Sequence, residues 1–367
     1  MPIPKPLRDL LSLPTAAYLE AAVLAYLERE CRKLPGVSLR YDRYRNLLAH
    51  YRHRPRGITP FVFVAHMDHP AFAALEMAGR RTLRAAFRGG VRVEYFDGAR
   101  VRFWTGDGWV RGRVQKVTKL EPVPGWTGRP EEVLIRVPGP VPQNAPGVWD
   151  LPEPFLRGDI LHAPGCDDVA GTAAMLALLQ RLSRRRVSGE VYCLFTRAEE
   201  VGFIGAIGAA RAGTIPKRLP VISIETSSEL PGVQIGAGPI LRVGDRAAIF
   251  TPALTAACQR VAESLRHRRK TFRYQRKLMD GGVCEAYPFL AYGYAATGIC
   301  VALGNYHNMD TRRQKIASEY ISVRDWLGMV DWFEALVRDE RGPVHDTAEM
   351  RAKIDPRFDA AEHMLLQ

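Results

Sequence analysis

The 367-residue chain lacks several patterns that would assign it at once to a common class of protein. No apolar run approaches the roughly 20 residues that a membrane-spanning helix needs. The six cysteines are never closer than 16 positions apart, so no C-x-x-C pair is available for a zinc ribbon or a redox couple. The sequence also has no phosphate-binding G-x-x-x-x-G-K loop, no G-x-S-x-G nucleophile elbow and no H-E-x-x-H zinc helix. These absences argue against a helical membrane protein, a disulfide-rich domain and the commonest nucleotide-binding and hydrolase signatures.

The composition is that of a basic globular protein. Hydrophobic residues make up 47% and charged residues 25% of the chain, close to the averages of folded domains. Lys and Arg number 52 against 39 Asp and Glu, which leaves a formal net charge of +13 at pH 7. A basic field attracts polyanions regardless of fold, so the charge alone raises the question of an anionic partner without answering it.

The hydrophobic N-terminal stretch is predicted to be part of the folded domain. Residues 7–27 are apolar enough to suggest a signal peptide, but Asp9 and Glu20 interrupt them and no small-residue cleavage site follows. From Pro14 to Leu34 the apolar residues recur at mostly helical spacing. We therefore expect an amphipathic helix over this stretch and a cytoplasmic protein without a membrane partner.

Strand and helix patterns alternate over most of the chain. The apolar run at 61–65 is too short for a helix and is typical of a buried parallel strand, and residues 37–50 alternate like edge strands. Further strands are predicted at 190–195, 221–224 and 299–303, and helices at 170–182, 205–212, 255–266 and 320–338. This alternation indicates βαβ units, so we predict an α/β fold: a three-layer α/β/α domain with a mainly parallel mixed sheet.

Residues 71–160 have a different pattern and are predicted to form an inserted domain. Period-two alternation predicts strands at 91–95, 100–104, 109–111 and 133–137, and the Asp97-Gly98 and Asp107-Gly108 pairs are typical of hairpin turns. Eleven Arg and Lys residues stand against three acidic residues between Arg80 and Lys119. We expect a small antiparallel β-barrel-like domain between two catalytic parts at 1–70 and 161–367. Its charge favours a surface or subunit contact over a specific nucleic acid.

Chemically active side chains cluster after the predicted strands. In an open α/β sheet, ligands bind at the carboxyl ends of the strands. The residues found just after the strands, or just before the helix predicted at 170, are His66, Asp68, Asp167, Asp168, Glu199, Glu200, Glu225 and His307. Two imidazoles and several carboxylates at one edge of a sheet suit either a cation site or an acid/base site.

Each of these residues has an ordinary explanation when it is taken alone. A His after a strand is most often a hydrogen-bonded surface or core residue, an Asp pair before a helix is most often a cap, and a Glu pair is usually solvated. Taken together, crowded carboxylates without a counter-charge would raise each other's pKa. Bound divalent metal is the simplest physical resolution of that repulsion.

Charge counting then predicts two divalent ions. The predicted ligands are His66, Asp167, Glu200, Glu225 and His307. Their three carboxylates and one bridging hydroxide match the charge of two divalent ions, whereas a single ion would leave the site too anionic. Two ions that share a carboxylate are a known arrangement in aminopeptidases, phosphatases and nucleases.

Two neighbouring residues are given catalytic roles. Asp68 stands two positions after His66, where its carboxylate can accept the second imidazole N–H and fix the tautomer. Glu199 is beside the ligand Glu200 but points elsewhere, which makes it the natural general base for an activated water.

These motifs, in this order, resemble a known enzyme family. The segments that carry the resemblance are His66-Met67-Asp68, Asp167-Asp168-Val169-Ala170-Gly171, Glu199-Glu200-Val201-Gly202, Glu225 and His307. They are similar to the motif set of the co-catalytic dizinc metallopeptidases. The inserted β domain and the Ile235-Gly236-Ala237-Gly238-Pro239 segment are most similar to the tetrahedral (deblocking, glutamyl) aminopeptidase branch. The resemblance covers essentially the whole chain.

The resemblance implies a two-metal aminopeptidase that removes residues from the N-terminus of a peptide. It assigns His66 and Glu225 to one ion, Glu200 and His307 to the other, and Asp167 to both. Zn²⁺ is the implied metal, with Co²⁺ and Mn²⁺ also suited to mixed nitrogen and oxygen ligands, and no other cofactor is expected. The resemblance also implies a homo-oligomer, in which the insert would serve in dimerisation or as a lid and dimers could build a dodecamer.

The chain departs from this branch at several positions. Glu225 stands where the branch usually has Asp, and His69 replaces a common acidic residue. The usual Gly-Gly-Thr-Asp segment is Gly281-Gly282-Val283-Cys284-Glu285 here, and the residues around His307 also differ. These differences concern substrate specificity and leave every predicted ligand in place.

Several alternatives stay open at this point. The same site would serve a deacylase of N-acyl amino acids or a related carboxypeptidase, and a two-metal phosphoesterase or nuclease would suit the basic charge. A non-catalytic metal-binding relative would lack a ligand or the base. Among single residues, His69 and His162 are further candidate ligands, and Cys166 beside the bridging position is more simply a buried thiol. The cationic run from Arg266 to Lys277 is either a solvated face or an anion contact near the site.

Overall fold

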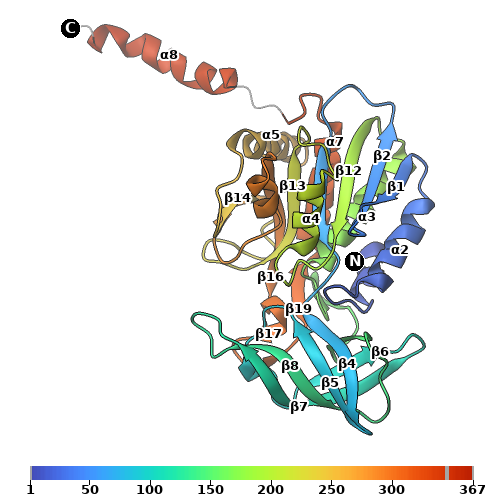
Figure 1. Ribbon diagram of the computed structural model, residues 1–367. Coiled ribbons are helices and arrows are strands. Elements are labelled where there is room, and N and C mark those ends of the chain that lie inside the picture. The colour runs from blue at the N-terminus through green and yellow to red at the C-terminus, as the bar shows by residue number, and fades with distance from the viewer. Residues whose placement is uncertain (1, 344–346, 366–367) are drawn as a thin grey trace.

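The computed structural model describes residues 2–343 and 347–365 and shows a sheet domain with a barrel at one end (Figure 1). The strands of the sheet are β1 (Val37–Tyr41), β2 (Leu47–His53), β3 (Phe61–His66), β10 (Phe155–Arg157), β11 (Ile160–Ala163), β12 (Gly189–Thr196), β13 (Val221–Ser228), β14 (Ile240–Asp245), β15 (Gln275–Met279), β16 (Ala296–Gly304) and β19 (Glu319–Ser322). Their order is β1-β2-β12-β3-β13-β16-β19-β11-β10, with β14 pairing β16 and β15 pairing β14. A central block of β12, β3, β13 and β16 is parallel.

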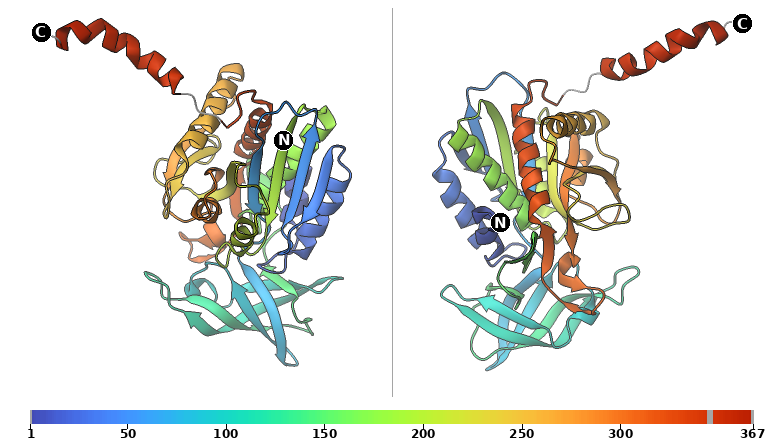
Figure 2. Two further views of the ribbon diagram at one scale, coloured as in Figure 1. Left: turned by 45° about the horizontal axis from the view of Figure 1, so that its top comes forward. Right: turned by 180° about the vertical axis from the view of Figure 1, so that it is seen from behind.

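Helices cover both faces of this sheet. They are α1 (Lys5–Leu11), α2 (Ala21–Arg32), α3 (Val169–Arg185), α4 (Ile204–Ala212), α5 (Pro252–Arg268), α6 (Ala286–Ala291) and α7 (Val323–Arg338). The view from behind in Figure 2 shows α2, α3, α5 and α7 lying over one face. Helices α4 and α6 contribute to a separate hydrophobic cluster on the opposite face. The predicted three-layer fold with a mixed sheet is therefore confirmed.

Strand β3 shows why helices pack on both faces of the sheet. All six of its residues are buried. Because successive side chains of a strand point to opposite faces, Phe61 and Phe63 pack into the core that includes α3 and α7, whereas Val62 and Val64 pack with α4 and α6. The rings of Phe63 and Phe333 lie 4.6 Å apart between centroids. A continuous apolar run therefore identifies a strand that is covered on both sides.

The insert forms a closed antiparallel barrel, as predicted. Its strands are β4 (Ala71–Gly79), β5 (Thr82–Arg88), β6 (Arg100–Trp104), β7 (Trp109–Glu121), β8 (Arg129–Arg136) and β9 (Pro146–Trp149), in the order β4-β5-β8-β7-β6-β9. An aromatic cluster fills its interior, with the Trp149 ring 4.8 Å from Phe72 and 5.2 Å from Phe96. After Trp149 the chain returns to the main sheet through β10 and β11. The predicted boundaries at 70 and 160 stay a prediction.

The barrel lies against the carboxyl ends of the central parallel strands. Only residues 67–70 separate the end of β3 from the start of β4. The short strands β17 (Met309–Asp310) and β18 (Lys315–Ile316) extend from the sheet domain, and Met309 and Ile316 pack against the barrel core. The barrel therefore lies beside the edge of the sheet at which the candidate ligands were predicted.

The structure corrects two local predictions. The helix predicted over 14–34 is present as α2 but begins only at Ala21; the chain between α1 and α2 is not helical, and Tyr18 there has a positive φ of 68°. Buried Glu20 stabilises that segment, because its carboxylate accepts the N–H groups of Tyr18 and Ala198. The strand predicted at 91–95 is instead a 3₁₀ turn at Val93–Tyr95, where Tyr95 turns into the barrel core.

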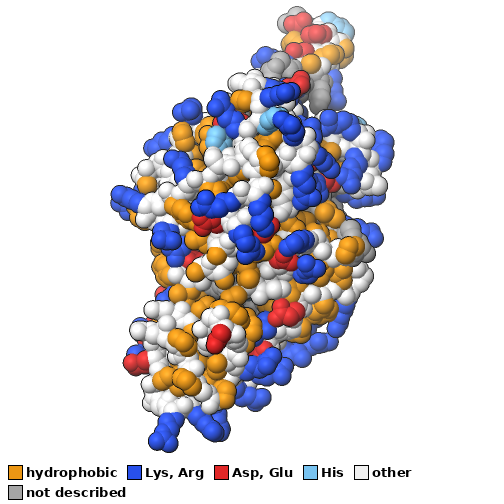
Figure 3. Space-filling view, turned by 90° about the vertical axis from the view of Figure 1, so that its right-hand side faces the viewer, with side chains coloured by type: hydrophobic (Ala, Val, Ile, Leu, Met, Phe, Trp, Pro, Cys, Tyr) orange, Lys and Arg blue, Asp and Glu red, His pale blue; other side chains and the backbone are white. Residues whose placement is uncertain are grey.

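The surface carries the predicted excess of positive charge. On the face shown in Figure 3, Lys and Arg side chains occur on the barrel at the bottom and on the sheet domain above it. The last helix, α8 (Ala348–Leu365), projects away from both (Figures 1 and 2). None of the described helices is both long enough and apolar enough to cross a membrane.

Candidate active site

Four parallel strands bring the predicted residues to one edge of the sheet. His66 is the last residue of β3, and Glu199 and Glu200 lie in the turn after β12. Glu225 is the fifth residue of β13, and His307 follows β16 in a short 3₁₀ turn. All of them are buried or half-buried. The sequence placed these side chains together correctly because neighbouring parallel strands end at the same edge.

The five predicted ligands form two overlapping groups of three. Ligand atoms of His66, Asp167 and Glu225 lie within 4.8 Å of one another, and so do those of Asp167, Glu200 and His307. In the first group His66 Nε2 is 3.8 Å from Asp167 Oδ1 and 4.0 Å from Glu225 Oε2. In the second group His307 Nε2 is 3.5 Å from Asp167 Oδ2 and 3.5 Å from Glu200 Oε2. The two oxygens of Asp167 therefore face different groups, which is the arrangement that a bridging carboxylate needs.

Both histidines are oriented through Nδ1, which leaves Nε2 free to bind a cation. His66 Nδ1 lies 3.0 Å from the backbone carbonyl oxygen of Asp68. His307 Nδ1 lies 2.7 Å from the carbonyl oxygen of Gly90, which follows β5 of the barrel. Because a carbonyl can only accept, Nδ1 carries the proton in both rings. The barrel thus contributes directly to the site, which the sequence did not reveal because a backbone acceptor leaves no residue-type signal.

Asp68 is positioned differently from the expectation. Its carboxylate is fully buried and lies 3.6 Å from His66 Nδ1, but its close contacts are with the next motif. Asp68 Oδ1 accepts the backbone N–H of Glu199 at 3.0 Å, and Oδ2 accepts that of Glu200 at 3.1 Å. It is the Asp68 carbonyl, not the carboxylate, that receives the imidazole proton. The Asp68 side chain therefore holds the turn that carries the predicted base and one ligand.

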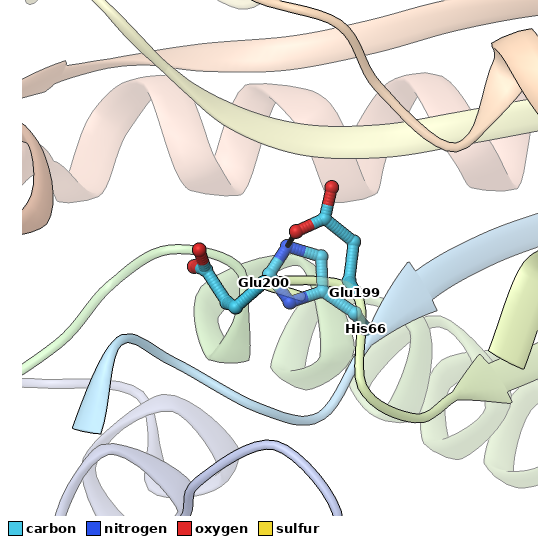
Figure 4. Close-up of side chains that lie close together, drawn as sticks. All are labelled: His66, Glu199 and Glu200. Atoms are coloured by element: carbon cyan, nitrogen blue, oxygen red, sulfur yellow. Dashed lines mark ion pairs between the residues drawn. The ribbon is translucent and has the colours of Figure 1, made fainter. Parts of the chain in front are cut away.

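Glu199 is the carboxylate closest to Nε2 of His66. Its Oε2 lies 3.7 Å from His66 Nε2, and Figure 4 shows the Glu199 carboxylate turned toward the imidazole while the Glu200 carboxylate lies apart from it. Both glutamates still lie near the imidazole, because ligand atoms of His66, Glu199 and Glu200 form a further group within 4.8 Å of one another. Burial raises the pKa of Glu199 well above its usual range, and Glu225 and Asp68 raise it further while His66 opposes them. The side chain is therefore more ready to take up a proton than an exposed glutamate is.

The remaining residues of the aspartate motif have supporting contacts. Asp168 is the N-cap of α3, where its carboxylate accepts the N–H of Gly171 at 3.1 Å. Cys166 is fully buried, and burial raises its pKa well above the usual range, which agrees with an unreactive buried thiol. His162 lies on β11 and stacks on Phe155 at 5.0 Å. His69 does not join either ligand group among the described residues.

The electrostatics of the site favour bound cations. Buried carboxylate oxygens of Glu200 and Glu225 have no hydrogen-bond partner among the described residues. Burial raises the pKa of Glu200 well above its usual range, with Glu199 adding to the effect, and raises that of Glu225 to about 8. Burial alone would lower the pKa of His66, but Glu199 and Asp68 hold it well above the usual range. Unpaired buried anions of this kind are costly, and the residues present fit a pair of divalent ions.

One buried acid near the site was given no role from the sequence. Glu285 caps the start of α6 and is fully buried, and neither of its carboxylate oxygens has a hydrogen-bond partner among the described residues. Burial raises its pKa to about 7, and His66 opposes the shift. The only sequence signal was its place at the end of the segment that departs from the usual Gly-Gly-Thr-Asp.

A pocket opens beside the first ligand group. Its lining includes His66, Glu225 and Glu199, the Gly281–Val283 segment and one cationic side chain, Arg242 on β14. Arg242 is only 3% exposed, and its Nε has no hydrogen-bond partner. Its one side-chain hydrogen bond, from Nη1 to Ser227 Oγ, is 3.3 Å long, and no carboxylate of the described residues forms an ion pair with it. Arg242 lines this pocket, and the carboxylates of Glu225 and Asp245 act on it electrostatically without contacting it as ion pairs.

Comparison with known proteins agrees with this geometry. The model of a family described as M42 glutamyl aminopeptidase matches residues 145–317, which include four of the five ligands. The chain resembles the M42 aminopeptidases. A protein of Acetivibrio thermocellus whose name proposes an aminopeptidase is 26% identical over 261 residues, which are 67% of this chain and 73% of that protein. The predicted resemblance to the tetrahedral branch is confirmed.

Solved aminopeptidase and peptidase structures share the fold of this chain. An aminopeptidase of the archaeon Desulfurococcus kamchatkensis has a TM-score of 0.74 at 22% identity, over 92% of this chain and 95% of that one. The TET1 peptidase of Pyrococcus horikoshii has a TM-score of 0.72 at 20% identity, over 91% of this chain and 98% of that one. At these identities the structural likeness establishes the fold, while the matching family model supports a peptidase hydrolase.

Proposed function

We propose that this protein is a two-metal aminopeptidase that cleaves the N-terminal peptide bond of its substrate. The observation that carries the proposal is the pair of ligand groups that share Asp167, one completed by His66 and Glu225 and the other by Glu200 and His307. Zn²⁺ is the proposed metal, and Co²⁺ or Mn²⁺ would accept the same nitrogen and oxygen ligands. When bound, two such ions supply Lewis acidity and lower the pKa of water at the site.

Glu199 would move the proton in this reaction. Its carboxylate is within 3.7 Å of His66 Nε2, so it reaches the side of the site where the first ion would be held. Because burial favours its protonated form, Glu199 Oε2 can take a proton from the attacking water and return it to the leaving amine nitrogen. Asp68 would keep Glu199 and Glu200 in register by accepting both of their backbone N–H groups.

We further propose that the preferred N-terminal residue is acidic. Arg242 is the one cation among the described residues that line the pocket, and it has no ion-pair partner of its own. A carboxylate on the substrate would supply that partner, and a charge-assisted hydrogen bond in a buried site is worth about 1.5–3 kcal/mol. The glutamyl specificity in the name of the matching family points the same way.

A phosphoesterase, a deacylase and a carboxypeptidase are less well supported. A phosphoesterase would need cations around the leaving phosphate, whereas the described pocket offers a single arginine. A deacylase of N-acyl amino acids or a carboxypeptidase would use the same metals, so only substrate tests separate it from an aminopeptidase. We also propose a homo-oligomer in which the barrel serves in dimerisation or as a lid, as the assemblies named for TET1 suggest. The six free buried cysteines suit the reducing cytoplasm as its location.

The proposal is tested by reconstituting the metal-free protein with Zn²⁺ or Co²⁺ and assaying a substrate panel. The panel contains glutamyl, leucyl and lysyl arylamides, N-acetylated amino acids and a phosphodiester. We expect turnover of the arylamides with the glutamyl compound preferred. The Glu199→Gln variant should lose about 10²- to 10⁴-fold in kcat while it keeps its metal. The exposed Glu229 provides a matched Glu229→Gln control.

Two outcomes would reject this function. Hydrolysis of the phosphodiester without the arylamides would favour the phosphoesterase, and full activity in Glu199→Gln would remove the proposed base. The acidic preference is tested separately with Arg242→Met, which should lower kcat/KM about 10- to 100-fold for the glutamyl arylamide and leave the leucyl compound nearly unchanged. An equal loss for both compounds would contradict the role of Arg242.

A further inference from the structure

His69 is buried behind the ligands without belonging to either ligand group. It follows Asp68 by one residue, and its side chain is 6% exposed. Its ring Nδ1 lies 2.6 Å from the backbone carbonyl oxygen of Asp167, and its Nε2 lies 2.9 Å from Asn308 Oδ1. A single side chain thus joins the segment of the bridging ligand to the segment of His307.

An acceptor atom faces each ring nitrogen of His69. The Asp167 carbonyl can only accept. The amide of Asn308 is oriented by its own bonds, because Nδ2 donates to the carbonyls of Pro164 at 2.6 Å and Ala317 at 3.1 Å, which leaves Oδ1 facing His69. His69 is therefore held in place through both of its ring nitrogens.

A nearby carboxylate holds the backbone of the Asp167 segment. Glu319 is fully buried, and its Oε2 accepts the backbone N–H groups of Cys166 at 2.5 Å and Asp167 at 3.1 Å. The close packing of Gly165 also fits the ring, because a Cβ at that position would come within 2.4 Å of His69 Cδ2. The His69 site is therefore closed, hydrogen-bonded and shaped for an imidazole.

The two halves of the metal site depend on this support to different degrees. His66 and Glu225 are residues of strands β3 and β13, which the sheet holds in place. His307 instead lies in a segment where Asn305, His307 and Asn308 all have positive φ, at 55°, 54° and 65°. Such conformations are unfavourable for residues other than glycine and persist only where surrounding contacts impose them.

We propose that His69 is a positioning residue that holds the His307 segment against Asp167, and that the ion of Asp167, Glu200 and His307 depends on it more than the other ion does. This inference rests on the proposed two-metal function. Loss of a hydrogen bond that orients a metal ligand without touching the metal typically weakens metal binding by about 10- to 100-fold. The effect should fall on one of the two ions.

Two substitutions separate the two hydrogen bonds. The amide nitrogen of Asn can take the place of imidazole Nδ1, and that of Gln can take the place of Nε2. His69→Asn would therefore keep the contact with Asp167 and lose the contact with Asn308, whereas His69→Gln would keep the latter. His162→Asn removes another half-buried imidazole, on β11, and serves as the control. Asn308→Ser removes the same contact from the opposite side.

The test is a Zn²⁺ titration of each metal-free variant against a competing chelator, which gives two affinities without any assay of activity. Wild type and His162→Asn should bind two ions. His69→Asn and Asn308→Ser should bind one ion within about threefold of wild type and the other about tenfold or more weakly, with His69→Gln in between. Thermal melting of the metal-free variants reports whether each one folds.

The possible failures are distinguishable. If wild type does not bind two ions, the two-metal proposal fails and this inference fails with it. If wild type binds two ions and both His69→Asn and Asn308→Ser bind them with unchanged affinities, or lose both equally, the positioning role of His69 is wrong while the two-metal function stands. Should His69→Asn not fold, Asn308→Ser and His69→Gln decide between the same outcomes.

Discussion

Zn²⁺ binding at this site is expected to depend steeply on pH, because the ion must displace protons from its own ligands. Burial raises the pKa of Glu225 to about 8 in the metal-free chain. About half of the Glu225 side chains are then ionised at pH 8, and about one in a hundred at pH 6. Since only the ionised form binds, this residue alone should weaken the ion of His66, Asp167 and Glu225 roughly 50-fold over that interval, or about 2.3 kcal/mol.

The sign of the effect follows from the direction of the shift. The folded pKa of Glu225 lies above the value of about 4.3 expected in the unfolded chain. As the pH falls through 8, Glu225 takes up a proton in the folded metal-free protein but not in the unfolded chain. Protonation of Glu225 therefore raises the free energy of unfolding of the metal-free protein and at the same time weakens metal binding. Glu200, whose pKa burial also raises, acts in the same direction on the second ion.

Isothermal titration calorimetry at pH 6, 7 and 8 measures this dependence. Repeating each titration in two buffers with different ionisation enthalpies counts the protons released per Zn²⁺. The Glu225→Gln variant should bind more weakly at pH 8 but release about one proton fewer, while the exposed Glu229→Gln control should match wild type. An affinity that stays within about threefold from pH 8 to pH 6, or a proton count that Glu225→Gln does not change, would refute the argument.

Three further changes test other parts of the structure. Asp68→Asn places an amide N–H₂ against the backbone N–H of Glu199 or Glu200. We expect kcat to fall about 10- to 100-fold in steady-state kinetics, with little loss of bound metal in metal analysis. An unchanged kcat would mean that the turn of Glu199 and Glu200 needs no carboxylate. Trp149→Ala empties the aromatic centre of the barrel and should cost about 3–5 kcal/mol in urea unfolding of that part of the chain, whereas a loss under about 1 kcal/mol would show a poorly packed barrel. Gly147→Ala would bring a Cβ within 2.3 Å of the Phe103 ring, so it should destabilise the same barrel by about 1–3 kcal/mol, and a neutral result would contradict that contact.

The clustering of the candidate ligands could be predicted from the sequence because it depends on a simple geometric rule. His66, Glu200 and His307 each follow an apolar run that forms a parallel strand, and such strands end at one edge. Helix and strand types were also predictable, since periodicity depends on which side of an element is buried. The same reasoning placed the start of the helix predicted at 14–34 too early, because buried Glu20 stabilises a non-helical segment between α1 and α2.

By itself, the amino-acid sequence determined the α/β class with its β insert, the identity of the five candidate ligands and the candidate base. Only the tertiary structure decided how those groups are oriented. The Gly90 carbonyl reaches His307 from the barrel, the Asp68 carboxylate binds the turn of Glu199 rather than an imidazole, and Arg242 is left without an ion pair. The reason is physical: such contacts involve backbone groups and residues distant in the sequence, which no periodic pattern of side chains encodes.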